Sequence, residues 1–336
     1  MKGSNVGDAA MRAIRVHRPG GPEVLRIEEI PRPEPRAGWV RIRVRAFGLN
    51  RSELFTRQGH SPAVRFPRVL GIECVGVVDD AGGTDLVAGQ TVAALMGGMG
   101  RDYDGGYAEY TLVPRDRVLP LRTDLPWDVL AALPETFLTA WGSLVEALEV
   151  ASGQTLLVRG GTSSVGMAAI SLAKGMGLRV IATTRDPAKA PALRDNGADD
   201  VLIDTGRIAE EVARRVPEGV DRLLELVGTV TLLDSLRAVA PRGIVCNTGI
   251  LGNAWVLERF EPLEDIPSTV KLTSYGSDTT SAARSTAALQ EIVDGVAAGR
   301  VRANLHRRFA FHEIVAAHRY MEGNRGSGKL VVVVDE

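Results

Sequence analysis

A short apolar run that leads into a glycine-rich turn and then a helix constrains this chain more than any other feature. Leu156-Leu157-Val158 is typical of a buried strand, the small residues of Gly160 to Gly166 form the turn, and a helical pattern covers 165–176. At such a junction, backbone N–H groups and the helix dipole face an anion. The junction therefore predicts a site for a dinucleotide pyrophosphate, and with it redox chemistry in which the cofactor supplies the hydride. The alternative is a turn that only joins a strand to a helix.

Strand and helix patterns alternate around this junction, which favours the nucleotide site over a purely connecting turn. Such alternation predicts a parallel, doubly wound sheet of six strands, the Rossmann type of α/β domain. The expected strands are 155–159, 179–184, 200–204, 222–227, 243–248 and 270–275, and the expected helices are 165–176, 188–196, 208–216 and 230–240.

The first 125 residues carry a different pattern, in which Pro- and Gly-rich turns separate short strands. The expected strands are 13–16, 24–28, 39–46, 74–78 and 107–113, followed by helical patterns at 127–132 and 136–147. Near the C-terminus, helical patterns at 287–298 and 312–322 precede a strand at 330–334, which we interpret as the chain returning to the first domain. We therefore expect a β domain of residues 11–125 and 276–336 and a nucleotide-binding domain of residues 126–275. Because Met11 precedes the first strand, residues 1–10 are expected to be a disordered extension.

Composition excludes several classes of protein. A chain of 336 residues is too long for one ordinary core, and no apolar stretch is long enough to span a bilayer. The net charge of −1 gives no reason to expect a nucleic-acid or membrane partner. The polar N-terminus lacks the apolar stretch of a signal peptide, and two cysteines, Cys74 and Cys246, do not make a disulfide framework. A cytoplasmic location is therefore expected.

The end of the second strand of the alternating region favours NADPH over NADH. An NAD enzyme places Asp or Glu there, whereas an NADP enzyme supplies cations. Here the strand ends at Thr184 and Arg185 follows, with Lys189 four residues later. Asp186 is acidic, but Asp186-Pro187 is typical of a helix N-cap followed by proline at the first helical position. The alternative for Arg185 is a solvated surface side chain.

Several short motifs together resemble the medium-chain dehydrogenase/reductase superfamily and, within it, the zinc-free quinone oxidoreductases. They are Gly48-Leu49-Asn50, Leu70-Gly71-Ile72-Glu73, the run from Asp104 to Tyr110, Leu138 to Trp141, the glycine turn and Gly328-Lys329-Leu330. The resemblance covers nearly all of residues 12–336. It implies a GroES-like β domain beside the Rossmann domain, a nicotinamide in the cleft between them, and a homodimer formed along the edge strand at 270–275.

The resemblance also assigns cofactor contacts by position. Thr162 to Gly166 would hold the pyrophosphate, Asn247 to Ile250 would lie near the nicotinamide, and Thr139 would lie beside its ring. This chain has Ser163 where the family often has glycine, and Asp204 where some NADPH-binding relatives have tyrosine near the adenosine phosphate. The full set of implied cofactor contacts is Thr139, Gly160, Gly161, Thr162, Ser163, Ser164, Val165, Gly166, Thr184, Arg185, Lys189, Val227, Asn247, Thr248, Gly249, Ile250, Tyr275 and Lys329.

Zinc is not expected. In the zinc alcohol dehydrogenases a cysteine aligns with Asn50 and a histidine with Ile72, and isoleucine cannot bind a metal. With two cysteines in the chain, the four-cysteine structural zinc lobe is also absent. The neighbours Glu73 and Cys74 resemble a metal pair, but alternation along a strand places them on opposite faces, and we interpret Cys74 as a buried structural residue.

Without zinc, a hydrogen-bond donor must polarise the acceptor, and a quinone or enone needs less polarisation than a ketone. By position, Asn50 is the first candidate. The family often has tyrosine at the site of Ser61, which can still donate a hydrogen bond, and His60 can supply a proton near neutral pH. The alternatives are that His60 is an exposed loop residue and that solvent supplies the proton.

The sequence thus predicts an enzyme that transfers a hydride from NADPH to a small quinone or α,β-unsaturated carbonyl. One alternative is an enoyl-thioester reductase acting on a carrier-bound substrate, which needs a basic surface. The other is a relative that binds NADPH without catalysis. The candidates for this basic surface are Arg51, Arg57, Arg65 and Arg68. The alternative for each of them is an ordinary surface arginine.

Overall fold

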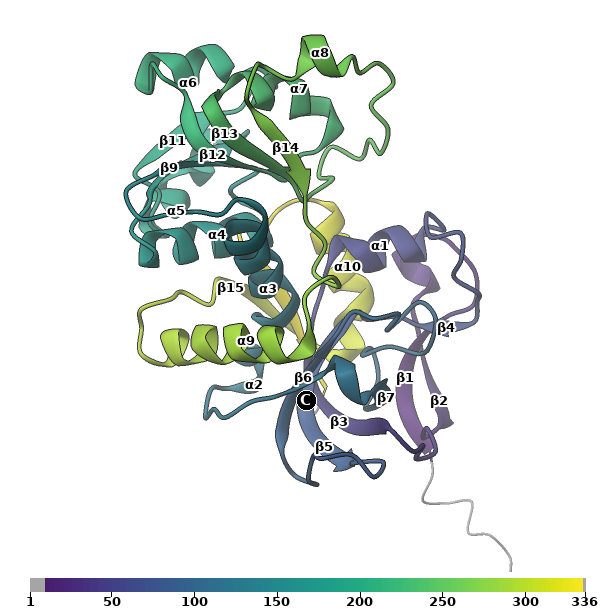
Figure 1. Cartoon of the computed structure of the whole chain (residues 1–336). Helices are drawn as coiled ribbons and strands as arrows, with labels where there is room; N and C mark the ends of the chain where they lie inside the picture. The colour runs from purple at the N-terminus through teal and green to yellow at the C-terminus, as the bar shows by residue number, and fades with distance from the viewer. Residues whose placement is uncertain (1–9, 335–336) are drawn as a thin grey trace, which may run out of the picture. The chain divides into compact units, whose positions relative to one another are not determined.

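The computed structural model describes residues 10–334 and divides into two compact units (Figure 1). Of the described residues, the first unit comprises 10–135, 281–294 and 305–334, and the second comprises 136–280 and 295–304. The expected boundary at 125/126 thus lies before the observed one at 135/136. Of the expected extension 1–10, only Ala10 lies within the described residues, and it is already the first residue of strand β1 (Ala10–Val16).

The second unit contains the predicted parallel sheet of six strands. Their order is β11-β10-β9-β12-β13-β14, and every neighbouring pair is parallel. The chain fills one half of the sheet outward from β9 and the other half outward from β12, so the strand order reverses between these two strands. Ligands of such sheets bind beyond the carboxyl ends of the strands at this reversal point. The strands are β9 (Thr155–Arg159), β10 (Arg179–Thr184), β11 (Asp200–Ile203), β12 (Val220–Glu225), β13 (Val239–Asn247) and β14 (Lys271–Ser274).

Helices cover both faces of this sheet (Figure 1). α4 (Ser164–Gly175) and α5 (Ala190–Asp195) lie on one face, and α6 (Ala209–Arg215) and α7 (Thr229–Arg237) lie on the other. The expected helix 230–240 is too long, because β13 already begins at Val239. Pro241 disfavours a helical conformation of the residue before it. The other helical segments that lie wholly or partly in this unit are α3 (Pro134–Gly142), the π-helical turn η4 (Ser143–Ala147), the 3₁₀ turn η5 (Pro187–Lys189), α8 (Pro262–Asp265) and α9 (Ala282–Ala297).

The first unit contains a seven-stranded and a three-stranded sheet. Six strands of the larger sheet follow the order β15-β16-β3-β5-β6-β8, and β7 also pairs with β3; the smaller sheet has the order β2-β1-β4. β16 pairs antiparallel with β3, so the last strand lies in the larger sheet of this unit. The strands not yet bounded are β2 (Arg26–Pro31), β3 (Trp39–Gly48), β4 (Arg68–Val69), β5 (Glu73–Asp80), β6 (Thr91–Leu95), β7 (Tyr110–Pro114), β8 (Val118–Pro120), β15 (Leu305–Ala310) and β16 (Lys329–Val333).

A short helix that the sequence patterns did not predict, α1 (Arg51–Arg57), follows β3 directly. Its N-cap is Asn50, and the Glu53 carboxylate accepts a hydrogen bond from the Asn50 backbone N–H at 2.9 Å, as in a capping box. The other helical segments of this unit are η2 (Pro22–Val24), η3 (Arg115–Arg117), α2 (Trp127–Ala131), η6 (Phe311–Glu313) and α10 (Ile314–Glu322). Across residues 10–334, no helix combines the length and apolar character needed to cross a lipid bilayer.

Candidate functional site

The glycine turn joins β9 to α4 in a conformation that depends on its small residues. Gly160 has a φ of +86°, which favours glycine, and a Cβ added to Gly166 would lie 2.5 Å from the Gly160 carbonyl oxygen. Ser163 is the N-cap of α4: its Oγ accepts from the Gly166 N–H at 3.1 Å and donates to the Gly160 carbonyl at 2.8 Å. The backbone N–H groups of Ser164 and Val165 belong to the first helical turn, which has no intrahelical acceptor for them. This turn can therefore receive an anion.

The residues after β10 present cations rather than a free acid. Thr184 is buried and Arg185 is exposed, while Lys189 is half-buried at the end of η5. Asp186 is the predicted N-cap, because its Oδ1 accepts from the Ala188 N–H at 3.0 Å and Pro187 occupies the first helical position. The acidic side chain nearest in sequence to Arg185 is thus engaged in capping.

The loop after β13 closes against the end of β12. The N–H groups of Thr248 and Gly249 donate to the Glu225 carbonyl oxygen at 2.9 and 3.2 Å, and a Cβ on Gly249 would overlap the Leu226 backbone. Within residues 10–334, the Oδ1 atom of Asn247 is buried without a hydrogen-bond partner. A buried acceptor without a partner is costly, and the NH₂ group of a nicotinamide carboxamide can satisfy it. The residues at this edge of the sheet therefore fit the cofactor.

Thr139 and Tyr275 lie in the same unit as this loop. The Thr139 carbonyl accepts from Ser143 Oγ at 2.7 Å, and Ser143 Oγ lies 2.9 Å from Thr248 Oγ1. These contacts connect α3 to the loop after β13. Tyr275 packs so closely on Gly142 that a Cβ there would overlap its ring. The structure thus brings Thr139 near the loop that the sequence assigns to the nicotinamide.

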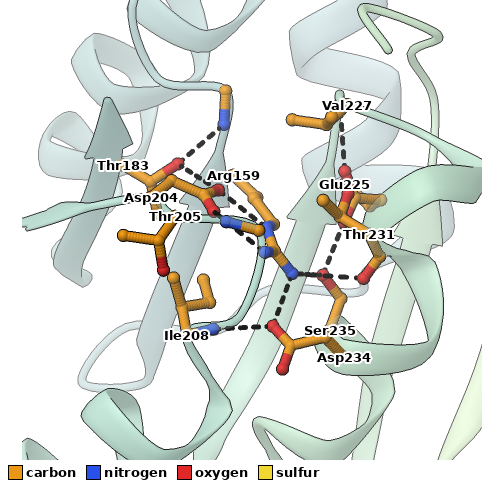
Figure 2. A network of polar contacts seen from close by, with 12 residues as sticks. Arg159, Thr183, Asp204, Thr205, Ile208, Glu225, Val227, Thr231, Asp234 and Ser235 are labelled. Atoms are coloured by element: carbon orange, nitrogen blue, oxygen red, sulfur yellow. Dashed lines mark hydrogen bonds and ion pairs between the residues drawn. The ribbon is translucent and has the colours of Figure 1, made fainter. Parts of the chain in front are cut away.

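A buried arginine directly before the glycine turn is the centre of a polar network in this unit (Figure 2). Arg159 is fully buried and binds Asp204 through two hydrogen bonds, Nε to Oδ2 at 2.8 Å and Nη2 to Oδ1 at 3.0 Å. Its Nη1 donates to Asp234 Oδ2 and to Ser235 Oγ, each at 2.9 Å. Burial raises the pKa of Asp204, but the hydrogen bonds and charge of Arg159 outweigh burial and hold this pKa below its usual range.

The network continues to the loop after β12, which the sequence also assigns to the cofactor. Glu225 Oε1 accepts from the N–H groups of Val227 at 2.7 Å and Gly228 at 3.0 Å. Its Oε2 accepts from the hydroxyls of Thr231 and Ser235. Burial raises the pKa of Glu225. Sequence reasoning missed this network; the available signal was an arginine at the last position of an otherwise apolar strand.

In the first unit, Asn50 belongs to a buried polar cluster. Its Oδ1 accepts from Lys329 Nζ at 2.6 Å, and its Nδ2 donates to Glu73 Oε1 at 2.8 Å. Lys329 Nζ also donates to Glu73 Oε1 at 2.7 Å. The second Nδ2 hydrogen faces Glu53 Oε1 across a long 3.4 Å. Lys329, which the resemblance assigns to the cofactor, thus contacts Asn50 and Glu73 in the structure.

Glu53 and Ile72 complete the surroundings of Asn50. Glu53 is buried and accepts from the Ile72 N–H at 3.0 Å. Burial raises the pKa of Glu53 to about 7, although the Ile72 hydrogen bond and the Lys329 charge act against this rise. Cys74 is buried as predicted, and burial raises the pKa of its thiol. Among the described residues, no group of three or more His, Cys, Asp or Glu side chains is placed to hold a metal ion.

His60 and Ser61 lie beyond the other end of α1. The two ends of this seven-residue helix are about 10 Å apart. Ser61 Oγ lies 2.9 Å from Thr56 Oγ1, and His60 is exposed. The structure therefore does not join these two residues to the cluster around Asn50.

Both interpretations of Arg57, as part of a basic surface and as an ordinary surface arginine, are wrong. Arg57 is fully buried and donates to Glu322, to the Gly20 carbonyl and to His318 Nδ1. Since a guanidinium only donates, Nδ1 of His318 accepts, and its proton lies on Nε2, 3.2 Å from the Tyr107 hydroxyl. Burial and the neighbouring Arg57 charge lower the pKa of His318 to about 3.

Comparisons with known proteins give the family. The alcohol dehydrogenase GroES-like domain matches residues 36–123, and a zinc-binding dehydrogenase domain matches residues 196–332. A quinone oxidoreductase from Pseudomonas aeruginosa is 31% identical over 327 residues, which cover 94% of this chain and 97% of that protein. The chain belongs to the zinc-free quinone oxidoreductase family of the medium-chain dehydrogenase/reductases. It is an oxidoreductase with a nicotinamide cofactor and a small-molecule substrate.

Solved structures agree with this assignment. A quinone oxidoreductase from Pseudomonas syringae pv. tomato matches with a TM-score of 0.88 and 26% identity over 96% of this chain and 100% of that one. A mycobacterial homologue solved in complex with NADPH matches with a TM-score of 0.84 and 27% identity, at the same coverage. A 2-haloacrylate reductase matches with a TM-score of 0.85 and 26% identity over 97% of this chain and 100% of that one. These matches confirm the predicted GroES-like and Rossmann domains.

Proposed function

We propose that this protein is a zinc-independent reductase that transfers a hydride from NADPH to a quinone or an α,β-unsaturated carbonyl. The observation that carries the proposal is the cluster around Asn50: an amide stands where the resemblance places a metal ligand of zinc-dependent relatives, and a lysine and two carboxylates surround it. Hydride addition to a conjugated acceptor spreads charge to its oxygen, and one well-placed donor stabilises that charge. The names of the quinone oxidoreductase and 2-haloacrylate reductase relatives agree with such acceptors.

Within the cluster, we assign the donor role to Asn50. Lys329 and Glu73 fix the amide, because Lys329 can only donate to Oδ1 and the Glu73 carboxylate accepts from Nδ2. The second Nδ2 hydrogen, which faces Glu53 across 3.4 Å, is only weakly engaged, so a substrate oxygen placed along this N–H can replace Glu53 as its acceptor. Asn50 therefore binds and polarises the acceptor, while the bound cofactor supplies the hydride. Solvent, Ser61 and His60 remain the candidates for the proton source.

In the second unit, the first turn of α4 holds the pyrophosphate and Asn247 orients the nicotinamide carboxamide. Arg185 and Lys189 bind the 2′-phosphate, which distinguishes NADPH from NADH. Two observations support this preference: Asp186 is engaged as a helix cap, and Asp204 is paired with Arg159. Neither acid is then free to accept the ribose hydroxyl of NADH.

Steady-state oxidation of NADPH and of NADH, with 1,4-benzoquinone and a panel of enones, tests the function. We expect turnover with NADPH, unchanged by EDTA. Loss of activity in EDTA, together with one zinc per chain by elemental analysis, would contradict the zinc-free mechanism. NADPH binding without turnover of any acceptor would favour the non-catalytic alternative.

A further inference from the structure

We propose that Arg159 is a specificity-determining residue: its pairing with Asp204 makes the end of β10 compatible with the 2′-phosphate of NADPH. This inference rests on the proposed NADPH preference. Arg159 acts through Asp204 and does not itself touch the cofactor, since it is fully buried.

The Asp204 carboxylate lies beside the residues that would surround the phosphate. The Asp204 N–H donates to the Thr184 carbonyl at 2.8 Å, so its backbone adjoins the last residue of β10, directly before Arg185. Its Oδ2 accepts from Thr183 Oγ1 at 3.4 Å, and this hydroxyl oxygen accepts from the Gly160 N–H at 3.0 Å. Thr183 thus links the Asp204 carboxylate to the first glycine of the turn. Figure 2 shows Asp204 beside Thr183.

An unpaired carboxylate at this position would repel a phosphate dianion. The repulsion would be poorly screened, because the Asp204 side chain is only 5% exposed. The guanidinium of Arg159, which also binds Asp234, offsets this charge through two hydrogen bonds to Asp204. Without Arg159, Asp204 would keep only the weaker contacts to Thr183 and to the Gly206 N–H.

Two other carboxylates share the network but lie away from the end of β10. Asp234, on α7, accepts from the Ile208 N–H at 2.8 Å and from Arg159. Glu225, on β12, accepts from the Val227 and Gly228 N–H groups on the nicotinamide side. Asp234 therefore offers a matched control, an acid bound to the same guanidinium but outside the proposed phosphate site.

A purely structural role for Arg159 makes a different prediction. The glycine turn would hold the pyrophosphate of NADPH and NADH alike, so loosening it would weaken both cofactors equally. A role in specificity changes the ratio of the two dissociation constants. This ratio is the decisive measurement, because it does not depend on turnover.

The experiment measures Kd for NADPH and NADH at pH 8 by fluorescence titration of the wild type and five variants, each checked for folding by circular dichroism. Arg159→Met should lower the NADPH preference about tenfold. Arg159→Met combined with Asp204→Asn should restore it to within about threefold of the wild type, because the repelling charge is gone. Arg159→Lys, which keeps the charge, and Asp234→Asn should stay within about twofold. Asp204→Asn alone should keep or raise the preference.

Several results would overturn the inference. One is a folded Arg159→Met variant with the wild-type ratio, and another is a double variant that stays as unselective as Arg159→Met. If Arg159→Met does not fold, the Asp204→Asn variant provides the test. A lower NADPH preference in this variant would show that the Asp204 carboxylate favours NADPH binding, which contradicts the proposed repulsion. If the wild type binds NADPH and NADH equally well, the proposed cofactor preference is contradicted. The inference on Arg159 is tested separately, by the change in the ratio of the two dissociation constants from one variant to another.

Discussion

Lys329 Nζ lies 2.7 Å from Glu73 Oε1, and both side chains are 1% exposed. The pair connects β16 to β5 across the end of β3, because β3 lies between these strands in the sheet. Gly48, the last residue of β3, makes room for it: a Cβ there would overlap both Glu73 Oε1 and Lys329 Cε. In the motif Gly48-Leu49-Asn50, the glycine thus leaves space for the buried ion pair, and the asparagine supplies the amide that the pair orients.

Breaking this pair should destabilise the protein strongly. Lys329→Met leaves Glu73 charged and buried, and removing one partner of a buried pair costs about 3–5 kcal/mol. Adding Glu73→Gln should recover part of the loss, as measured by denaturant unfolding. The exposed pair Lys174–Asp199 is the control, with side chains 37% and 40% exposed; Lys174→Met should cost about 0–1 kcal/mol. Equal losses at the two sites would show that burial does not strengthen the Lys329–Glu73 pair.

Glu53 should make stability fall as the pH rises from about 4.5 to 7. Its pKa is raised from 4.5 to about 7, chiefly by burial, so the folded state binds more protons than the unfolded state in this window. The stability it contributes is full below pH 4.5 and lost as the pH rises through 7. Glu53→Gln cannot ionise, so the wild type should lose about 2–3 kcal/mol relative to this variant between pH 4.5 and 8.

Unfolding of both proteins at several pH values measures this difference. Glutamine places an NH₂ group where the carboxylate accepts hydrogen bonds. We therefore expect the unfolding free energies of the two proteins to differ by a pH-independent amount, which does not report on the pKa of Glu53. The slope of the difference with pH is the test, and because both proteins contain His318, its own titration largely cancels. A difference that does not change with pH would contradict the raised pKa.

The sequence predicts the parallel sheet well, because strand and helix patterns alternate along this whole segment. The observed β9 and β10 have the predicted bounds. Of the strands that were missed, β4 has only two residues and β8 only three, and β6 and β15 show no strict alternation of apolar and polar residues. Helix α1 has only seven residues, and its one local signal was the capping pattern from Asn50 to Glu53.

The polar networks could not be predicted from local patterns. Arg159 and Asp204 are 45 residues apart in sequence, and Lys329 and Glu73 are 256 apart. Nothing near either residue specifies its partner, since the fold alone brings them together. The glycine turn was predictable because all its parts are adjacent in sequence.

Arg185 should carry most of the discrimination against NADH. We expect wild-type protein to bind NADPH at least about tenfold more tightly than NADH, and Arg185→Ala to lose most of this difference, since one charge-assisted phosphate contact contributes about 1.5–3 kcal/mol. Arg194→Ala, a neighbouring arginine in the last turn of α5, is the control and should leave the ratio unchanged. Titration of both cofactors gives the result, and equal affinities in the wild type would refute the preference.

The second unit should form a twofold homodimer along β14, the last strand of its sheet. Light scattering at micromolar concentration should give twice the chain mass of 35.9 kDa. Val256, which is 72% exposed in the segment between β13 and β14, is a candidate contact, and Val256→Lys should weaken the dimer. Val87→Lys, at a valine 64% exposed in the first unit, should not. A wild-type monomer would contradict the expectation.

Asn50→Ala should lower kcat/KM with a good quinone or enone about 10²-fold, the scale of losing one donor to a developing oxyanion, while NADPH affinity stays nearly constant. The same change also removes the partner of Lys329 and Glu73, so unfolding must be measured beside the kinetics. Asn50→Asp keeps an acceptor for Lys329 but loses the donor and sets a second carboxylate against Glu73, so a matching loss of rate assigns the effect to the donated hydrogen bond only if its unfolding free energy matches that of Asn50→Ala. His60→Ala should lower the rate only about threefold, because this side chain is exposed and water can replace it as proton donor. If His60→Ala proves the more damaging change, the proton comes from the loop after α1, and Asn50 is only a structural partner of the buried pair.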